Sequence, residues 1–156
     1  MVQYEKDISV IIRCRNEEEH IGLAIQSVID HFKNPEIIII DNQSTDESMK
    51  VVSLFDRHDI TKYSLNGNYT PGKALNFGVK KANNDIILIL SAHSQITTLD
   101  IEMLDQWFRQ GHVAVFGNQT PIYKGKRISK RYIWSHFTND TTENLYSNIE
   151  DRYFLH

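Results

Sequence analysis

Three short apolar segments, rich in isoleucine and valine, organise the first two thirds of the chain. They lie at Ile8–Ile12, Ile37–Ile40 and Ile86–Leu90, and polar residues follow each one directly. Continuous apolar runs of this length, rather than alternating ones, are typical of strands that are covered on both faces, as in a parallel sheet. The pattern therefore predicts three buried parallel strands.

Segments with helical periodicity lie between and after these strands. Apolar residues recur at i, i+3 and i+4 spacing between Glu17 and Phe32, and three glutamates open the segment, where the helix dipole favours carboxylates. The run Ser44-Thr45-Asp46-Glu47 is typical of a capping box and predicts a second helix. Pro71-Gly72-Lys73 predicts the start of a third helix.

Weaker strand patterns lie at about 60–65 and 112–117. Alternating strands and helices indicate the α/β fold class with a mainly parallel sheet and right-handed connections. We expect a single domain over residues 1–156, in which 122–156 is irregular. The apolar and aromatic end at Arg152–His156 has no terminating signal, which suggests an interrupted chain.

Composition and charge narrow the class of protein. The chain has 156 residues, of which 40% are hydrophobic and 24% charged, which is ordinary for a globular domain. Its formal charge of −3 argues against a nucleic-acid partner. The single cysteine, Cys14, excludes an internal disulfide and suits a reducing compartment. No apolar run approaches the roughly 20 residues that span a membrane, so we expect a cytoplasmic protein.

The three strands end in polar segments that predict a binding crevice. These segments are Arg13–Glu17, Asp41–Asp46 and Ser91–Ser94. Ligands of open α/β sheets bind outside the carboxyl ends of the strands, so these segments should converge. Asp41 either caps the following turn or faces a ligand. His93 is either a turn residue or a ligand contact beside small neighbours.

Absent motifs exclude several ligand classes. The sequence has no GxGxxG after the first strand, no GxxxxGK[ST] and no GxSxG. These absences argue against a dinucleotide site of the Rossmann type, a P-loop and the usual hydrolase elbow. Lys73 and Asn76 lie on the first turns of a predicted helix, where they either approach a phosphate or are solvated.

At this point the motifs, taken in order, resemble a known family. ISVIIRCRNEEEHI, EIIIIDNQSTDES, GKALNFGVKKANNDIILIL and SAHS are similar to the N-terminal, nucleotide-sugar-binding half of family 2 glycosyltransferases. The resemblance covers roughly Ile8 to Gln119. It implies a GT-A fold, which is a Rossmann-like three-layer α/β/α sandwich. The later segment FGNQTPIYKGKRISKRYIWSHF resembles bacterial enzymes that build cell-surface polysaccharides.

The resemblance implies a donor site for a nucleoside-diphosphate sugar, typically UDP-linked. Asp41 would accept a hydrogen bond from the base, and the segment from Arg13 to Glu17 would border the base and ribose. The residues expected at the donor nucleotide are Arg13, Cys14, Arg15, Asn16, Glu17, Asp41, Asn42, Ser44, Lys73, Asn76, Ser91 and Ala92.

One departure from the family concerns the metal. The family usually has Asp-x-Asp after the third strand, where carboxylates hold Mn²⁺ or Mg²⁺ against the diphosphate. Here the triplet is Ser91-Ala92-His93. His93 is then the candidate metal ligand and would assist the leaving group, and we expect weaker metal binding or another phosphate-neutralising group. The basic stretch Lys124–Arg131 is either that group, a solvated loop or a contact with an anionic membrane.

The implied activity is inverting sugar transfer to a saccharide or lipid-linked acceptor. The family's catalytic base is expected beyond residue 156, so this role is not carried onto Glu150 or Asp151. A non-catalytic nucleotide-sugar-binding module or assembly subunit is the alternative, and a receiver-like or flavodoxin-like domain explains the motifs less well. The aromatic residues near the C-terminus suit a homodimer interface or a surface covered by further residues.

Overall fold

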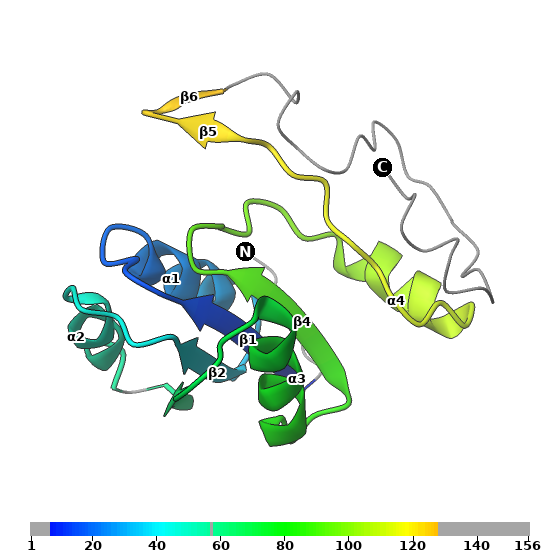
Figure 1. Cartoon of the computed structure of the whole chain (residues 1–156). Coiled ribbons are helices and arrows are strands. Elements are labelled where there is room, and N and C mark those ends of the chain that lie inside the picture. Colours follow the sequence, from blue (N-terminus) through cyan, green and yellow to red (C-terminus); the bar gives the residue numbers. More distant parts are fainter. Residues whose placement is uncertain (1–6, 57, 128–156) are drawn as a thin grey trace, which may run out of the picture. The chain divides into compact units, whose positions relative to one another are not determined.

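The computed structural model describes residues 7–56 and 58–127, and its centre is a four-stranded, wholly parallel sheet (Figure 1). The strand order is β3-β2-β1-β4. The bounds are β1 (Ile8–Cys14), β2 (Glu36–Asp41), β3 (Ile60–Ser64) and β4 (Ile86–Ser91). The three predicted strands and the weaker strand near residue 60 are therefore confirmed. The predicted burial is correct for β1 and β2 but wrong for β4, which lies at the edge of the sheet and leaves Ile89 54% exposed.

Four helices and a small hairpin complete the part of the chain that the structure describes. The helices are α1 (Ile21–His31), α2 (Ser48–Ser53), α3 (Pro71–Lys81) and α4 (Ile101–Arg109). The hairpin pairs β5 (Ile122–Tyr123) with β6 (Lys126–Arg127). Contacts divide the chain into two units, residues 1–103 and 104–156. The prediction of one domain over 1–156 stays a prediction.

The first unit has three layers because residues of β1 alternate between two apolar cores. Val10, Ile12 and Cys14 face a core that contains α1 and α2, whereas Ile11 faces the core of α3. All six residues of β2 are buried. Figure 1 shows α1 and α3 on opposite sides of the sheet. This arrangement confirms the predicted three-layer α/β/α sandwich.

The strand register brings the predicted polar segments to one edge of the sheet. Cys14 pairs with Asp41 across β1 and β2, and Arg13 pairs with Ser91 across β1 and β4. The chain connects β1 to β2 on the α1 face and returns from β3 to β4 on the α3 face. The point between β1 and β4 is therefore the topological switch point, where α/β sheets bind ligands.

A buried polar network joins the strands at the opposite edge. The Ser9 hydroxyl donates to the Glu36 carboxylate, which also accepts from the backbone N–H of Asn83 at 2.9 Å and from its side-chain amide. The Asn84 N–H donates to Ser9 Oγ at 3.2 Å. Because buried polar groups are costly when they lack partners, this network fixes where β4 starts relative to β1 and β2.

Two predicted helix starts were wrong. Helix α1 begins at Ile21 rather than Glu17, because the Glu17 carbonyl accepts from the N–H groups of both His20 and Ile21 in a turn that precedes the helix. Helix α2 begins at Ser48, and Ser44 does not cap it. Hydrogen bonds to Asp41 and Asn16 occupy the Ser44 hydroxyl instead.

The described part of the chain after β4 departs further from the sequence pattern. The strand predicted at 112–117 is absent from the described structure, where Val113 is 81% exposed and Phe116 is 55% exposed. The pattern missed α4, at whose start Asp100 Oδ1 accepts from the Met103 N–H at 2.9 Å. It also missed the hairpin, because 122–127 was predicted to be irregular.

Several expectations lie outside the described residues. They concern the part of the basic stretch beyond Arg127, the two acids Glu150 and Asp151, and the C-terminal aromatic residues. Within the described part of the chain, no helix combines the length and apolar character needed to cross a membrane.

The tight contact between α3 and β1 yields a stability prediction. A Cβ added at Gly78 would lie 2.6 Å from Ile11 Cγ2, whereas one added at Gly72 would meet nothing within 4 Å. Overpacking costs about 1–3 kcal/mol, which outweighs the gain of up to about 1 kcal/mol from replacing a helical glycine. We expect urea unfolding to show that Gly78→Ala is destabilised and that Gly72→Ala is not. Equal stability of the two variants would contradict this packing.

Candidate functional site

The Asp41 carboxylate organises the loop that follows β2. Its Oδ1 accepts from the Ser44 hydroxyl at 2.6 Å and from the Ser44 N–H at 3.2 Å. Asp41 itself is buried, with 7% of its surface exposed. The structure therefore gives Asp41 the turn-forming role that the sequence left open, and the predicted contact with a nucleotide base stays a prediction.

Ser44 then joins this loop to the loop after β1. Its Oγ accepts from the Asn16 N–H at 3.0 Å, and Asn16 Oδ1 accepts from the Thr45 N–H at 2.8 Å. Asn16 adopts a left-handed φ of 53°, which asparagine tolerates better than most residues. The pair of hydrogen bonds holds the two loops against each other at the carboxyl edge of the sheet.

Further hydrogen bonds continue this connection toward α2. Glu18 N–H donates to Asp46 Oδ2 at 3.0 Å, and Glu47 N–H donates to Glu18 Oε2 at 2.8 Å. The Glu17 N–H donates to Ser48 Oγ at 2.7 Å. Desolvation opposes ionisation of Asp46, but hydrogen bonds from Ser48 and Glu18 outweigh it and lower the pKa of Asp46.

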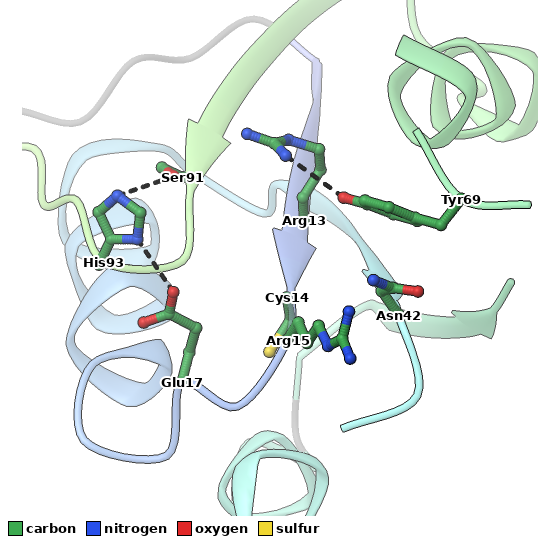
Figure 2. Close-up of a pocket in the computed structure, with 8 residues that line it drawn as sticks. All are labelled: Arg13, Cys14, Arg15, Glu17, Asn42, Tyr69, Ser91 and His93. Atoms are coloured by element: carbon green, nitrogen blue, oxygen red, sulfur yellow. Dashed lines mark hydrogen bonds and ion pairs between the residues drawn. The ribbon is translucent and has the colours of Figure 1, made fainter. Parts of the chain in front are cut away.

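A pocket of about 230 Å³ lies where these loops meet the end of β4 (Figure 2). Residues from β1 and β4, from the loops after β1, β2 and β4, and from the segment before α3 line it. They are Arg13, Cys14, Arg15, Glu17, Asn42, Tyr69, Ser91 and His93. The pocket therefore occupies the switch point that the strand order defines.

One wall of the pocket is a chain of three hydrogen-bonded side chains. His93 Nδ1 lies 3.0 Å from Glu17 Oε1, and His93 Nε2 lies 3.3 Å from Ser91 Oγ (Figure 2). The segment that carries His93 is attached to α1, because the Ile96 N–H donates to Ser27 Oγ at 3.1 Å. Glu17 is the single carboxylate among the lining residues, and it contacts the imidazole.

The facing wall carries the cationic groups. Arg13 Nη1 donates to Tyr69 Oη at 3.3 Å, and Arg15 and Asn42 also line the pocket (Figure 2). The Asn42 N–H donates to the Cys14 carbonyl at 2.9 Å, which fixes the backbone of the loop after β2 against β1. The wall thus presents two guanidinium groups, a phenol and an amide.

The structure brings about half of the predicted site residues together. Those that line the pocket are Arg13, Cys14, Arg15, Glu17, Asn42, Ser91 and His93. Those that do not line it are Asn16, Asp41, Ser44, Lys73, Asn76 and Ala92. Lys73 donates from Nζ to the Asn68 carbonyl at 3.3 Å, and Asn76 is exposed on α3. Whether any of these thirteen residues contacts a nucleotide stays a prediction.

Sequence reasoning missed Tyr69. The signal that was available is its place immediately before Thr70 and Pro71, which start α3 through the Thr70 side-chain cap. A residue just before a helix of an α/β sheet often lies at the ligand-binding edge, but no pattern in the polar segment before it distinguishes Tyr69 from its neighbours.

The residues at the end of β4 do not form a carboxylate site for a divalent cation. Mn²⁺ and Mg²⁺ favour several oxygen ligands in a near-octahedral arrangement. Ser91 and His93 offer a hydroxyl and an imidazole, and Glu17 adds one carboxylate that already contacts His93. Among residues 7–56 and 58–127 no three His, Cys, Asp or Glu side chains converge in a way that holds a metal. This donor set does not fit a metal that carboxylates hold against a diphosphate.

The connection between the two loops yields a second stability prediction. Ser44→Ala removes a hydroxyl that donates to Asp41 and accepts from Asn16. We expect a loss of about 1–3 kcal/mol, because the two partners lose hydrogen bonds in a partly buried place. Urea unfolding measures it. The matched control Ser64→Ala changes an exposed serine at the end of β3 and should stay within about 0.5 kcal/mol. A similar small change for both variants would refute the role of Ser44.

The buried thiol of Cys14 yields a prediction about pH. Desolvation by burial is the main reason that the pKa of Cys14 lies above its usual value of 9.0, against the opposing hydrogen bonds of Ser48 and Ser44. Because the folded-state pKa is the higher one, the thiol's contribution to stability is complete below pH 9.0 and is lost as the pH rises. When the pH rises from about 8 to about 10, we expect the free energy of unfolding to fall less for Cys14→Ala than for the unsubstituted chain. Urea unfolding at each pH measures this difference. Equal losses would contradict this assignment.

Curated relatives of this chain are glycosyltransferases. A GalNAc(5)-diNAcBac-PP-undecaprenol beta-1,3-glucosyltransferase of Campylobacter jejuni is 31% identical over 129 residues, which cover 80% of this chain and 41% of the relative. A poly-beta-1,6-N-acetyl-D-glucosamine synthase of Staphylococcus epidermidis is 31% identical over 96 residues, which cover 60% of this chain and 23% of the relative. The chain thus spans less than half the length of these relatives.

Solved structures share the fold. Residues 1–349 of TarS of S. aureus, in complex with UDP, superpose with a TM-score of 0.59 at 22% identity, over 67% of this chain and 32% of that one. The mannosyltransferase PcManGT of Pyrobaculum calidifontis, in complex with GDP-Man and Mn²⁺, gives a TM-score of 0.54 at 19% identity, over 62% of this chain and 30% of that one. These similarities confirm the GT-A fold.

The family assignment rests on most of the chain. Residues 9–154 match the family described as Glycosyl transferase family 2, a range that includes all four strands of the parallel sheet from Ser9 onward and the whole pocket. The resemblance noted from the ordered motifs is therefore confirmed, and the chain belongs to glycosyl transferase family 2.

Proposed function

We propose that this chain is the donor-binding part of an inverting glycosyltransferase in cell-surface polysaccharide synthesis. The donor is a nucleoside-diphosphate sugar, typically UDP-linked, and the acceptor is a saccharide or a lipid-linked saccharide. The observation that carries the proposal is the polar pocket between the carboxyl ends of β1 and β4. A polar pocket at a switch point suits a nucleotide better than an apolar ligand.

The names of relatives and neighbours support the choice of donor and acceptor. The Campylobacter jejuni relative is named for a polyprenyl-diphosphate-linked acceptor, and the Staphylococcus epidermidis relative is named for a polysaccharide product. TarS structures hold UDP and UDP-GlcNAc. Relatives that share this part of the chain thus act on the substrate classes that we propose here.

The proposed reaction is a single displacement. An acceptor hydroxyl oxygen bonds to the anomeric carbon as the bond from that carbon to the diphosphate oxygen breaks. The hydroxyl proton passes to a general base, to which we assign no residue of this chain, and the nucleoside diphosphate leaves with the electron pair. The residues of this chain serve the leaving side, where they bind the donor and offset its negative charge.

Two groups of residues have different proposed roles in donor binding. Asp41 serves the base, as the family resemblance implies, and its carboxylate must then exchange a hydrogen bond from Ser44 for one from the base. Asn42, which lines the pocket, serves the donor nucleotide. Lys73 and Asn76, at the start of α3, lie outside the pocket and serve a longer ligand that extends beyond it. His93 remains the candidate contact for the leaving group.

We also propose a cytoplasmic location at the inner face of the membrane, and a homodimer. A basic hairpin supports the membrane contact, since Lys124, Lys126 and Arg127 are exposed and anionic lipids attract such clusters. The undecaprenol-linked acceptor in the name of the Campylobacter jejuni relative agrees with a membrane-side location. Vesicle co-sedimentation and analytical ultracentrifugation test these two proposals separately.

A non-catalytic nucleotide-sugar-binding module is the second candidate function. The replacement of the family's Asp-x-Asp by Ser91-Ala92-His93 favours it, because that position usually supplies the metal ligands. Both candidates require a donor site, and transfer of sugar to an acceptor distinguishes them.

A nucleotide panel tests the donor site. We expect isothermal titration of this chain with UDP, GDP, dTDP and CMP to show saturable binding of one nucleotide, with UDP favoured. Ser91→Tyr places a bulky side chain in the pocket and should abolish binding, whereas Ser64→Tyr changes an exposed serine at the end of β3 and should not. Circular dichroism checks that both variants are folded. Binding that survives Ser91→Tyr would refute this pocket as the donor site.

A further inference from the structure

Two arginine side chains of the pocket lack an acidic partner among the residues that the structure describes. Arg13 contacts the Tyr69 hydroxyl, and neither Arg13 nor Arg15 forms an ion pair with any carboxylate in the described part of the chain. The one acidic lining residue, Glu17, contacts His93 on the opposite wall (Figure 2). The side chains that line the pocket therefore include two guanidinium groups and one carboxylate.

The position of Arg13 bears on what its guanidinium can bind. It lies on β1, between β2 and β4, and it is half-buried rather than fully solvated. Because residues of a strand alternate between faces, Arg13 follows Ile11 onto the α3 face, where Tyr69 also packs. The guanidinium of Arg13 has five N–H donors, of which the Tyr69 hydroxyl accepts one, so its other donors can bind an anion in the pocket.

We propose that the side chains of Arg13 and Arg15, in the segment that the family resemblance places beside the base and ribose, bind the diphosphate of the donor instead. They would take over the charge neutralisation that a carboxylate-held metal usually supplies. The inference rests on the proposed function and names the residues that act at that site. Each guanidinium donates in a planar fork that matches two phosphate oxygens, which a lysine cannot do. Tyr69 is a positioning residue, because its hydroxyl holds Arg13 toward the pocket.

The same arrangement explains why the end of β4 tolerates Ser91 and His93. Once two positive charges face the diphosphate, the end of β4 does not need carboxylates, which would repel the phosphates without a metal between them. The His93–Glu17 contact keeps the remaining carboxylate turned toward the imidazole. Donor binding by this chain should therefore depend little on Mn²⁺ or Mg²⁺.

The experiment compares a nucleoside diphosphate with its nucleoside by isothermal titration, using UDP and uridine, or GDP and guanosine, as the panel above directs. The dissociation constant of the nucleoside divided by that of the nucleoside diphosphate isolates the contribution of the diphosphate. We expect Arg13→Gln and Arg15→Gln each to lower this ratio by roughly tenfold or more, as loss of a charged hydrogen bond predicts, with little change for the nucleoside. Arg15 is exposed, so its variant should fold even where Arg13→Gln is damaged.

Two further variants serve as comparisons. One tests whether loss of any positive charge weakens diphosphate binding, and the other tests whether Tyr69 positions Arg13. Lys80→Gln removes one positive charge from an exposed position in the last turn of α3 and should leave the ratio unchanged. Tyr69→Phe keeps the ring but removes the hydroxyl that holds Arg13, and it should weaken diphosphate binding by a few-fold while nucleoside binding persists. Titrations in EDTA and in Mn²⁺ should give affinities within about threefold of each other.

Each outcome decides between the inference and its rivals. Equal losses for the diphosphate and the nucleoside would mean that the arginines contact the base, which overturns the inference. Diphosphate binding that requires Mn²⁺, and that His93→Ala abolishes, would also overturn it and leave the proposed donor site intact. If the unsubstituted chain binds no nucleotide, the proposed function and this inference fall together.

Discussion

The hydrogen bonds of the Asp41 carboxylate to Ser44 are the constraint on which the carboxyl edge of the sheet depends. Ser44 transmits this constraint to Asn16, and through Asn16 the loop after β1 is fixed against the loop after β2. Both loops would otherwise leave backbone N–H groups without partners at the edge of a buried sheet. The pocket has a defined shape because its two neighbouring loops satisfy each other's hydrogen bonds.

The isoleucine runs determine how much of the fold the sequence predicts. Ile37–Ile40 is apolar on both faces, which leaves little alternative to a central strand, and the prediction there was correct. Short sequence patterns gave a wrong prediction where a side chain forms hydrogen bonds with residues outside the pattern. Ser44 has the right spacing for a capping box, but Asp41 and Asn16 use its hydroxyl, and neither contact is visible to a pattern of four residues. The run near Val113 is apolar, but it remains exposed and forms no strand.

In the candidate site, too, the sequence predicted features that depend on neighbouring residues but missed contacts between residues far apart along the chain. The sequence placed Arg13, Glu17 and His93 at strand ends, and topology then predicted that they meet. It did not predict that Glu17 and His93 contact each other, because 76 residues separate them. Nor did it predict Tyr69, whose partner Arg13 lies 56 residues away on β1. Such pairs depend on the register of β1 against β4 and on the packing of α3.

The connection between the loops has a consequence for how this site can diverge. The side chains that join the loops are Asn16, Glu18, Ser44, Asp46 and Ser48, and none of them lines the pocket. Apart from Asp41, which also has a proposed contact with the base, the side chains that join these loops are different from those that line the pocket. Natural variation at Arg15 or Asn42 can therefore change what the pocket accepts while the hydrogen bonds between the loops stay the same.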